Sequence, residues 1–233
     1  MVEEGADLLD IGGESTRPGA SPVGAAEEMD RVLPVIEGIR DAVSVPISVD
    51  TSKPVVMQAA VRTGAGMVND VSALQSPDAI GTVAALGVPV CLMHRQGEPR
   101  TMQQNPVYID VVADICRFLR ERVMACEAGG IPRDRLVVDP GFGFGKNLSH
   151  NLELLRHLRT IAALGLPVMA GLSRKSLIGM ATGLPVERRL HASVLLATIA
   201  AQNGARILRV HDVGPTFEAV RMLEAAQPEL VET

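Results

Sequence analysis

Polar side chains follow short apolar segments at seven places along this sequence. Asp50, Asn69 and Asp139 supply carboxylate and amide oxygens, which accept hydrogen bonds in defined directions and suit a flat heterocycle with several N–H groups. Cationic side chains follow other segments and suit an anion such as phosphate, which Arg binds with its planar guanidinium fork. These cations are Arg17, Lys175, Arg209 and His211. Together the residues predict a site for a polar heterocycle that carries a phosphorylated arm.

Each of these side chains also has a structural explanation that needs no ligand. Asp50 could cap the helix that follows it, and Asp139 could open a turn before Pro140. Asn69 and Asp70 could form a turn at the end of a strand. These explanations must be repeated at successive segment ends, whereas one common site accounts for all of them. We therefore favour the site.

The histidines and lysines have their own alternatives. His94 and His211 lack metal-ligand spacing to another His, which alone favours structural roles, and His150, His157 and His191 fall in helical segments and are interpreted as structural. The chain has only three lysines, and each closely follows a segment end, although nineteen arginines would suffice for surface charge. These lysines are Lys53, Lys146 and Lys175.

The glycine-rich segment 140–147 does not match a nucleotide-binding loop. A Walker A loop needs Gly, four residues and then Gly-Lys-Ser/Thr, whereas position 140 is Pro and Asn147 follows Lys146. The glycine spacing does not fit a dinucleotide fingerprint either. We interpret the segment as a rim loop whose phenylalanines, Phe142 and Phe144, either cover a bound ring or pack against the protein.

The elements that position these groups alternate regularly. Seven apolar runs lack polar alternation, as buried parallel strands do, and the segments between them show helical periodicity, with helix starts expected near Ser76 and Ser149. The predicted strands are 7–11, 46–49, 67–71, 88–93, 135–138, 167–170 and 205–210.

Strict strand–helix alternation predicts an α/β fold with a parallel sheet and right-handed crossovers. A doubly wound open sheet concentrates its ligand groups at one switch point, whereas barrel strands surround a common mouth. Because nearly every predicted strand ends in a polar cluster, the pattern favours a TIM (β/α)8-type barrel with seven units visible and the first unit missing. No linker divides the chain, so we predict one barrel domain over residues 1–233.

Composition excludes several classes of protein. The formal net charge is −5 and aromatic residues make up 2%, which disfavours nucleic acid and anionic membrane as partners. Three cysteines without a Cys-x-x-Cys pair argue against a disulfide framework or thiolate zinc site. No apolar run approaches the roughly 20 residues of a membrane span, and the acidic start does not resemble a signal peptide. We expect a cytoplasmic protein.

Five motifs closely resemble signatures of the dihydropteroate synthase family. They are DIGGESTRPG at 10–19, ISVDTSKP at 47–54, DPGFGFGKN at 139–147, SRKS at 173–176 and RVHDV at 209–213. The resemblance covers nearly the whole chain and implies a pterin-binding TIM barrel that acts in folate biosynthesis and is a target of sulfonamides. The implied reaction condenses 6-hydroxymethyl-7,8-dihydropterin diphosphate with p-aminobenzoate, giving dihydropteroate and diphosphate.

The resemblance also implies a role for each matching residue. The pterin would be held by Asp50, Asn69, Asp139, Lys175 and Arg209. The diphosphate would lie near Thr16, Arg209 and His211. The p-aminobenzoate side would be formed by Arg17, Pro18, Phe144, Lys175 and Ser176. The catalytic residues would be Lys175, Arg209 and His211.

The sequence departs from the family pattern at its start. Family members begin with another strand and a loop carrying an Asn-Val-Thr-Pro-Asp-Ser-Phe-Ser-like motif, whose Asn helps to bind Mg²⁺ with the diphosphate. We therefore expect Mg²⁺ as cofactor but no metal ligand in this chain. We also expect in-frame DNA upstream of Met1 to encode the missing unit of roughly 40 residues, which would raise turnover more than it tightens pterin binding.

Two alternative functions remain open at this stage. The chain could be a non-catalytic, truncated pterin-binding barrel, or the pterin-binding domain of a corrinoid-dependent methyltransferase. The combination of Ser173–Ser176 with Arg209–His211 favours the synthase. We expect small-molecule substrates, no nucleic-acid or membrane partner, and a homodimer.

Overall fold

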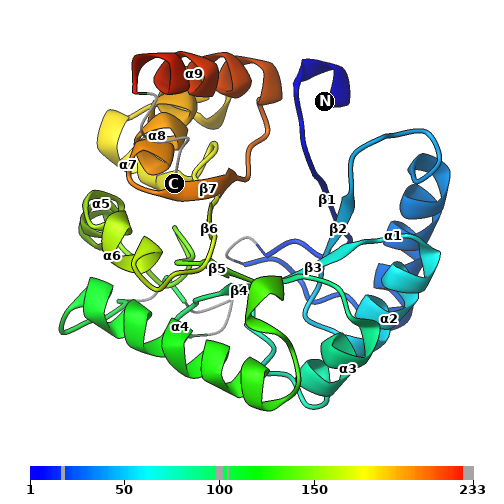
Figure 1. The fold of residues 1–233 in the computed structure, drawn as a ribbon. Coiled ribbons are helices and arrows are strands. Elements are labelled where there is room, and N and C mark those ends of the chain that lie inside the picture. The colour runs from blue at the N-terminus through cyan, green and yellow to red at the C-terminus, as the bar shows by residue number, and fades with distance from the viewer. Residues whose placement is uncertain (17–18, 98–101, 104, 228–233) are drawn as a thin grey trace.

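Seven parallel strands form one curled sheet in the computed structural model, which describes residues 1–16, 19–97, 102, 103 and 105–227 (Figure 1). Strands adjacent in the chain are adjacent in the sheet, so their carboxyl ends lie at the same edge. The strands are β1 (Leu9–Gly12), β2 (Ile47–Asp50), β3 (Met67–Asp70), β4 (Val90–Met93), β5 (Leu136–Asp139), β6 (Val168–Ala170) and β7 (Ala205–Leu208). The α/β barrel-type fold and all seven predicted strands are confirmed.

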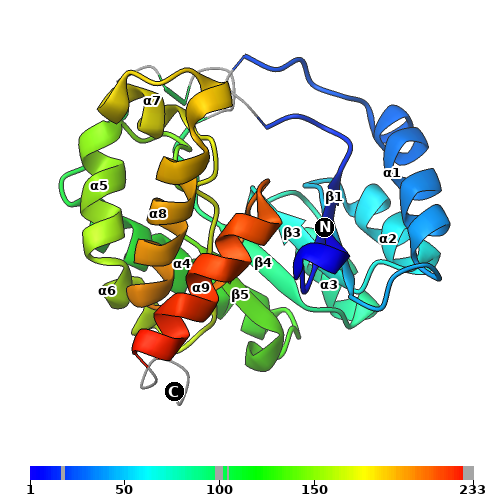
Figure 2. The same cartoon turned by 90° about the horizontal axis from the view of Figure 1, so that it is seen from above.

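Helices follow the strands and cover the outer, convex face of the sheet (Figure 1, Figure 2). They are α1 (Ala25–Ile39), α2 (Pro54–Thr63), α3 (Ala79–Leu86), α4 (Val111–Ala128), α5 (Leu148–Arg156), α6 (Leu158–Ala162), α7 (Ser176–Thr182), α8 (Leu190–Gln202) and α9 (Val213–Ala226). Three short 3₁₀ helices are η1 (Val2–Glu4), η2 (Arg133–Arg135) and η3 (Val186–Arg188). None of these helices in the described ranges has the length and apolarity needed to cross a membrane.

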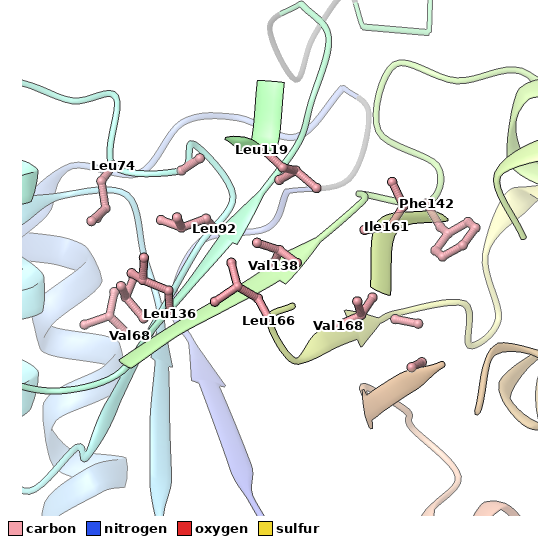
Figure 3. Close-up of a cluster of buried hydrophobic side chains, with 14 of the residues drawn as sticks. Val68, Leu74, Leu92, Leu119, Leu136, Val138, Phe142, Ile161, Leu166 and Val168 are labelled. Atoms are coloured by element: carbon pink, nitrogen blue, oxygen red, sulfur yellow. The ribbon is translucent and has the colours of Figure 1, made fainter. Parts of the chain in front are cut away.

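Alternate strand residues enter two different apolar environments. Val68, Leu92 and Val138 belong to the large cluster between sheet and helices (Figure 3). On the same strands, Met67 and Cys91 belong to a smaller cluster of buried residues separate from the first. The strands are therefore apolar on both faces, which explains why their sequences show no polar alternation.

The starts of two helices differ from the sequence prediction. Helix α5 begins at Leu148 because Asn147, not Ser149, is its N-cap: the Asn147 side chain accepts a hydrogen bond from the His150 backbone N–H at 2.8 Å. Helix α3 begins at Ala79, directly after the expected start at 76–78, but its N-cap is Asp78 and not Ser76, and the Asp78 side chain makes no cap hydrogen bond. The Asn147 cap therefore sets the start of α5, whereas α3 starts where the turn after β3 ends.

Candidate active site

Strands β1, β2 and β3 bring two carboxylates and an amide together at one edge of the sheet. Asp50 pairs in register with Gly12 on one side and with Asn69 on the other. The Asn69 side-chain amide donates a hydrogen bond to Asp10 Oδ2 at 3.0 Å. The predicted residues Asp50 and Asn69 are thus neighbours, and Asp10 joins them although the sequence analysis gave it no role.

Arg209 lies directly after β7, at one end of the sheet, and its side chain contacts residues of β1 and β2 at the other end. Its Nε donates to Asp10 Oδ2 at 2.6 Å, and its terminal nitrogen donates to Asp50 Oδ2 at 2.9 Å. The sheet order begins at β1 and ends at β7, and no strand pairing joins these two strands in the described part of the chain. Side chains therefore bridge positions that are 199 and 159 residues apart in the sequence. Asp50 therefore forms a cluster with Asp10 and Arg209. It does not cap α2, whose N-cap residue is Lys53.

Asp139 and Lys175 form the opposite part of the site, after β5 and β6. Asp139 is buried, and its Oδ1 accepts a hydrogen bond from the Gly141 backbone N–H at 2.7 Å. The Lys175 ammonium donates to the Phe142 carbonyl and lies 4.8 Å from the centre of the Phe144 ring. Asp139 therefore opens the turn, as one of its two explanations predicted, and its contact with a ligand stays a prediction.

The two phenylalanines of the glycine-rich loop have different roles. Phe142 is fully buried in the apolar cluster between sheet and helices (Figure 3), whereas Phe144 is half-buried beside Lys175. Packing against the protein is therefore correct for Phe142. The position of Phe144 is compatible with covering a bound ring.

Burial controls the protonation of the site. It raises the pKa of Asp50 to about 7, with Asp10 adding to the increase and Arg209 opposing it. It also raises the pKa of Asp139, against the effect of Lys175, and lowers the pKa of Lys175 to about 8, against the effect of Asp139. Asp10 Oδ1 and Ser48 Oγ are buried without a hydrogen-bond partner within the described residues. These acceptors suit a ligand rich in N–H groups.

We expect Asp50→Asn to stabilise the fold at high pH. The pKa of Asp50 is about 7 in the folded protein, compared with an ordinary value of 3.8. Between roughly pH 4 and pH 7 the unfolded chain releases a proton that the folded protein retains, so wild-type stability falls as pH rises. The gain in Tm should be small at about pH 4 and larger at about pH 8. Exposed Asp41→Asn is the control, and an equal gain at both pH values would contradict the shift.

The segments after β6 and β7 are joined to each other. His211 Nδ1 lies 3.0 Å from Ser173 Oγ, and its backbone N–H donates to the same oxygen at 3.3 Å. The Arg174 guanidinium makes two hydrogen bonds to the Asp212 carboxylate. Arg174 therefore ties two loops together, while Lys175 and Arg209 reach the inside of the site.

The loop after β1 is fixed by an ion-pair cluster. Lys53 donates to both Glu14 and Glu28, and Glu14 also accepts from the Val23 backbone N–H at 3.0 Å. Lys53 is therefore a loop anchor. Thr16 is half-buried in this loop, Ser176 is exposed at the start of α7, and the predicted residues Arg17 and Pro18 lie outside the described residues.

Asn69 and Asp70 serve different purposes despite being adjacent. Asp70 accepts hydrogen bonds from the backbone N–H groups of Ser72 and Leu74, both at 2.8 Å, and from Ser52 Oγ at 2.5 Å. The turn explanation is therefore correct for Asp70, whereas Asn69 belongs to the site. Side-chain alternation along β3 sends the two residues to opposite faces of the sheet.

The carboxylates Asp10 and Asp50 are paired with Arg209. Among the residues that the structure describes, no group of three His, Cys, Asp or Glu side chains is placed to hold a metal ion. Asp10 and Asp50 accept hydrogen bonds from Arg209 instead. The site thus offers hydrogen-bond acceptors at its centre, with Arg209 and Lys175 as the cations beside them.

The fold and these groups are typical of an α/β-barrel enzyme with a polar site at the carboxyl ends of its strands. The model of the family of pterin-binding enzymes matches residues 1–211. Dihydropteroate synthase from Haemophilus influenzae is 50% identical over 225 residues, covering 97% of this chain and 82% of that protein. The synthase from Escherichia coli is 49% identical, covering 97% and 80%. The chain belongs to the dihydropteroate synthase family.

Solved structures agree with this assignment. The Yersinia pestis synthase in a sulfonamide drug complex superposes with a TM-score of 0.96 at 48% identity, covering 97% of this chain and 82% of that one. The Xanthomonas albilineans synthase with 4-aminobenzoic acid gives a TM-score of 0.93 at 54% identity, with coverage of 97% and 81%. The same enzyme in complex with 7,8-dihydropteroate gives 0.89 at 50% identity, again covering 97% and 81%.

Proposed function

We propose that this chain catalyses the dihydropteroate synthase reaction at the site described above. Membership of the family supports the reaction, and the relatives crystallised with 4-aminobenzoic acid and with 7,8-dihydropteroate support the substrate classes. The single observation that carries the proposal is the cluster of Asp10, Asp50, Asn69 and Arg209 at one end of the site, with Asp139 and Lys175 opposite.

The pterin ring is the natural ligand of the buried acceptors. Its ring N–H and exocyclic amino groups donate hydrogen bonds, and Asp139, Asn69 and Asp50 supply oxygens that accept them. Lys175 donates to a ring carbonyl or nitrogen of the pterin. Buried carboxylates also favour positive charge on the pterin methylene carbon, which develops when the leaving group departs.

The reaction exchanges one bond at that methylene carbon for another. The C–O bond to diphosphate breaks, and its electron pair leaves with the diphosphate. The p-aminobenzoate nitrogen then supplies the electron pair of the new C–N bond and loses a proton. Arg209, His211 and Thr16 surround the departing negative charge, and Phe144 and Ser176 lie on the side from which the arylamine enters.

Mg²⁺ is a partner of the substrate diphosphate in this proposal. Mg²⁺ usually keeps several waters and binds through substrate phosphates with one or two carboxylates. Since the described part of this chain holds no three-residue metal cluster, we propose that Mg²⁺ arrives bound to the pterin diphosphate.

Diphosphate release and pterin binding, measured together on the 233-residue chain, test the proposed function. We expect calorimetric binding of the pterin diphosphate, and diphosphate release that requires p-aminobenzoate and stops when EDTA removes Mg²⁺. Binding without release would instead favour a non-catalytic barrel. Transfer of a methyl group from a methylpterin to a corrinoid would favour the methyltransferase alternative, and loss of both binding and release would contradict a pterin site.

The expected homodimer is a further proposal, supported by apolar side chains on helices α8 and α9. These helices lie side by side (Figure 2), and they expose Leu195 on α8 and Met222 on α9 by 59% and 68%. Sedimentation should give twice the mass of one chain. Leu195→Glu should shift the mass to that of a monomer, whereas Met124→Glu on α4, equally exposed at 67%, should not.

A further inference from the structure

Lys146 is a fully buried lysine beneath the glycine-rich loop, and the reaction described above does not use it. Burial lowers the pKa of its amino group well below the ordinary value. Its side chain is 1% exposed. Its Nζ lies 3.0 Å from His94 Nδ1, 2.9 Å from the Gly141 carbonyl oxygen and 3.0 Å from the Phe144 carbonyl oxygen. A charged amino group has three N–H donors, and a neutral one has two donors and one acceptor. In either state these three partners use its full hydrogen-bonding capacity, so Lys146 has no donor left for a substrate.

We propose that Lys146, together with His94, is a positioning residue of the pterin site. It holds the glycine-rich loop in the one conformation that orients both Asp139 and Lys175. This inference rests on the proposed function, because the loop matters only if Asp139 and Lys175 bind the pterin.

Backbone groups of the glycine-rich loop connect Lys146 to both Asp139 and Lys175. Lys146 binds the carbonyl of Gly141, whose N–H donates to Asp139 Oδ1 at 2.7 Å. It also binds the carbonyl of Phe144, so its two loop contacts lie on either side of Phe142, whose carbonyl accepts from Lys175. Fixing these peptide groups fixes the partners of Asp139 and Lys175.

The loop also fits closely against the segment that follows β4. A Cβ added to Gly141 would lie 1.8 Å from the His94 carbonyl oxygen, and one added to Gly145 would lie 2.4 Å from the Gln96 carbonyl oxygen. Both glycines have positive φ, 70° and 64°. Only glycine allows the backbones of these two segments to come so close. Their close packing brings the His94 ring to the Lys146 Nζ.

His94 is held in the state that accepts this hydrogen bond. Its ring meets Phe118 edge-on, with centroids 4.9 Å apart and an interplanar angle of 89°. Burial, with the Lys146 charge, lowers the pKa of His94 to about 3. The ring is therefore neutral, and with its proton on Nε2 its Nδ1 can accept a hydrogen bond from Lys146.

A role in stability alone does not account for this arrangement. Burying a lysine amino group is costly, and an apolar side chain of similar length would fill the same space without that cost. Within the described residues, the hydrogen bonds of the Lys146 side chain go to the loop and to His94. The contacts specify a loop conformation, which an apolar side chain would not do.

Lys146→Met, which keeps the length of the side chain, tests this role against Ile36→Ala as control. Ile36 is fully buried near the C-terminal end of α1, which packs on α2 and β1, so its truncation should lower Tm without changing the loop after β5. For Lys146→Met we expect pterin binding to be at least about tenfold weaker and kcat to fall by up to about the 100-fold that a 1 Å misplacement costs in rate. The control should keep wild-type affinity and kcat at temperatures where it is folded.

Hydrogen exchange gives a readout that does not depend on activity. The amides of Gly141 and Gly143 donate to Asp139 and Asn151, so they should be protected in the wild type and lose protection in Lys146→Met. Protected loop amides together with unchanged affinity in folded Lys146→Met would overturn the proposal. If the wild type binds no pterin, the proposed function fails, while loop exchange still decides whether Lys146 holds the loop.

A second pair of variants replaces His94 and serves if Lys146→Met does not fold. His94→Asn places its Oδ1 the same number of bonds from Cα as the histidine Nδ1, and therefore retains an acceptor for Lys146. His94→Leu removes it. We expect His94→Asn to keep pterin affinity within about threefold and His94→Leu to lose about tenfold or more. Equal affinities for the two variants would overturn the proposal.

Discussion

Replacing Arg209 with Met is expected to lower kcat by about 100- to 1,000-fold, the usual effect of removing one donor from a developing negative charge. Arg209 donates to Asp10 and Asp50 in the described structure and lies where the diphosphate is proposed to leave. Its loss removes positive charge from the leaving group and leaves two carboxylates without their cation. Steady-state diphosphate release measures the effect.

Two further variants separate the charge of Arg209 from its geometry. Arg209→Lys keeps the charge but loses the planar fork that binds two carboxylates at once, so its kcat should fall between those of wild type and Arg209→Met. Arg221→Met on α9 removes an exposed arginine and should leave kcat unchanged. A folded Arg209→Met protein with kcat within about twofold of wild type would exclude Arg209 from the chemistry.

Replacing Asp139 with Ala is expected to weaken pterin binding by about 10- to 150-fold, which corresponds to the 1.5–3 kcal/mol of a hydrogen bond to a charged group. Asp139 is buried at the end of β5 beside Lys175, so a ligand N–H that it accepts has no water to replace it. Calorimetric titration with the pterin diphosphate measures the loss, and thermal unfolding shows that the fold is retained.

Asp139 also accepts the Gly141 N–H, so a second variant is needed to separate loop from ligand. Asp139→Asn keeps an oxygen for Gly141 but replaces the other oxygen with a donor, which repels a ligand N–H. It should therefore lose nearly as much affinity as Asp139→Ala. Asp134→Ala in the exposed 3₁₀ helix η2 is the control and should bind normally. Normal pterin affinity in both Asp139 variants would remove Asp139 from the site.

The sequence alone determined the strand–helix order and most of the site. Seven uninterrupted apolar runs indicated buried parallel strands, and the carboxyl ends of such strands meet at one edge. Asp50, Asn69 and Asp139 therefore had to lie at the same edge of the sheet, wherever the helices packed. The five motifs also indicated the substrates, because the residue types and their order are specific to one family.

Other assignments depended on which face of a strand a residue occupies. Strand β3 is apolar on both faces, so its sequence does not show that Asn69 enters the site while Asp70 builds the following turn. Asp10 lies inside β1, and a carboxylate within an apolar strand is the signal that could have identified it.

Only the tertiary structure decided what Lys146 and Arg209 contact. Lys146 follows a strand end just as Lys175 does, yet one is buried beneath the loop and the other enters the site. Arg209 reaches Asp10 because the sheet curls until its two end strands face each other across the mouth. Long side chains reach several ångströms in any direction, so the packing of distant segments, not local sequence, selects their partners.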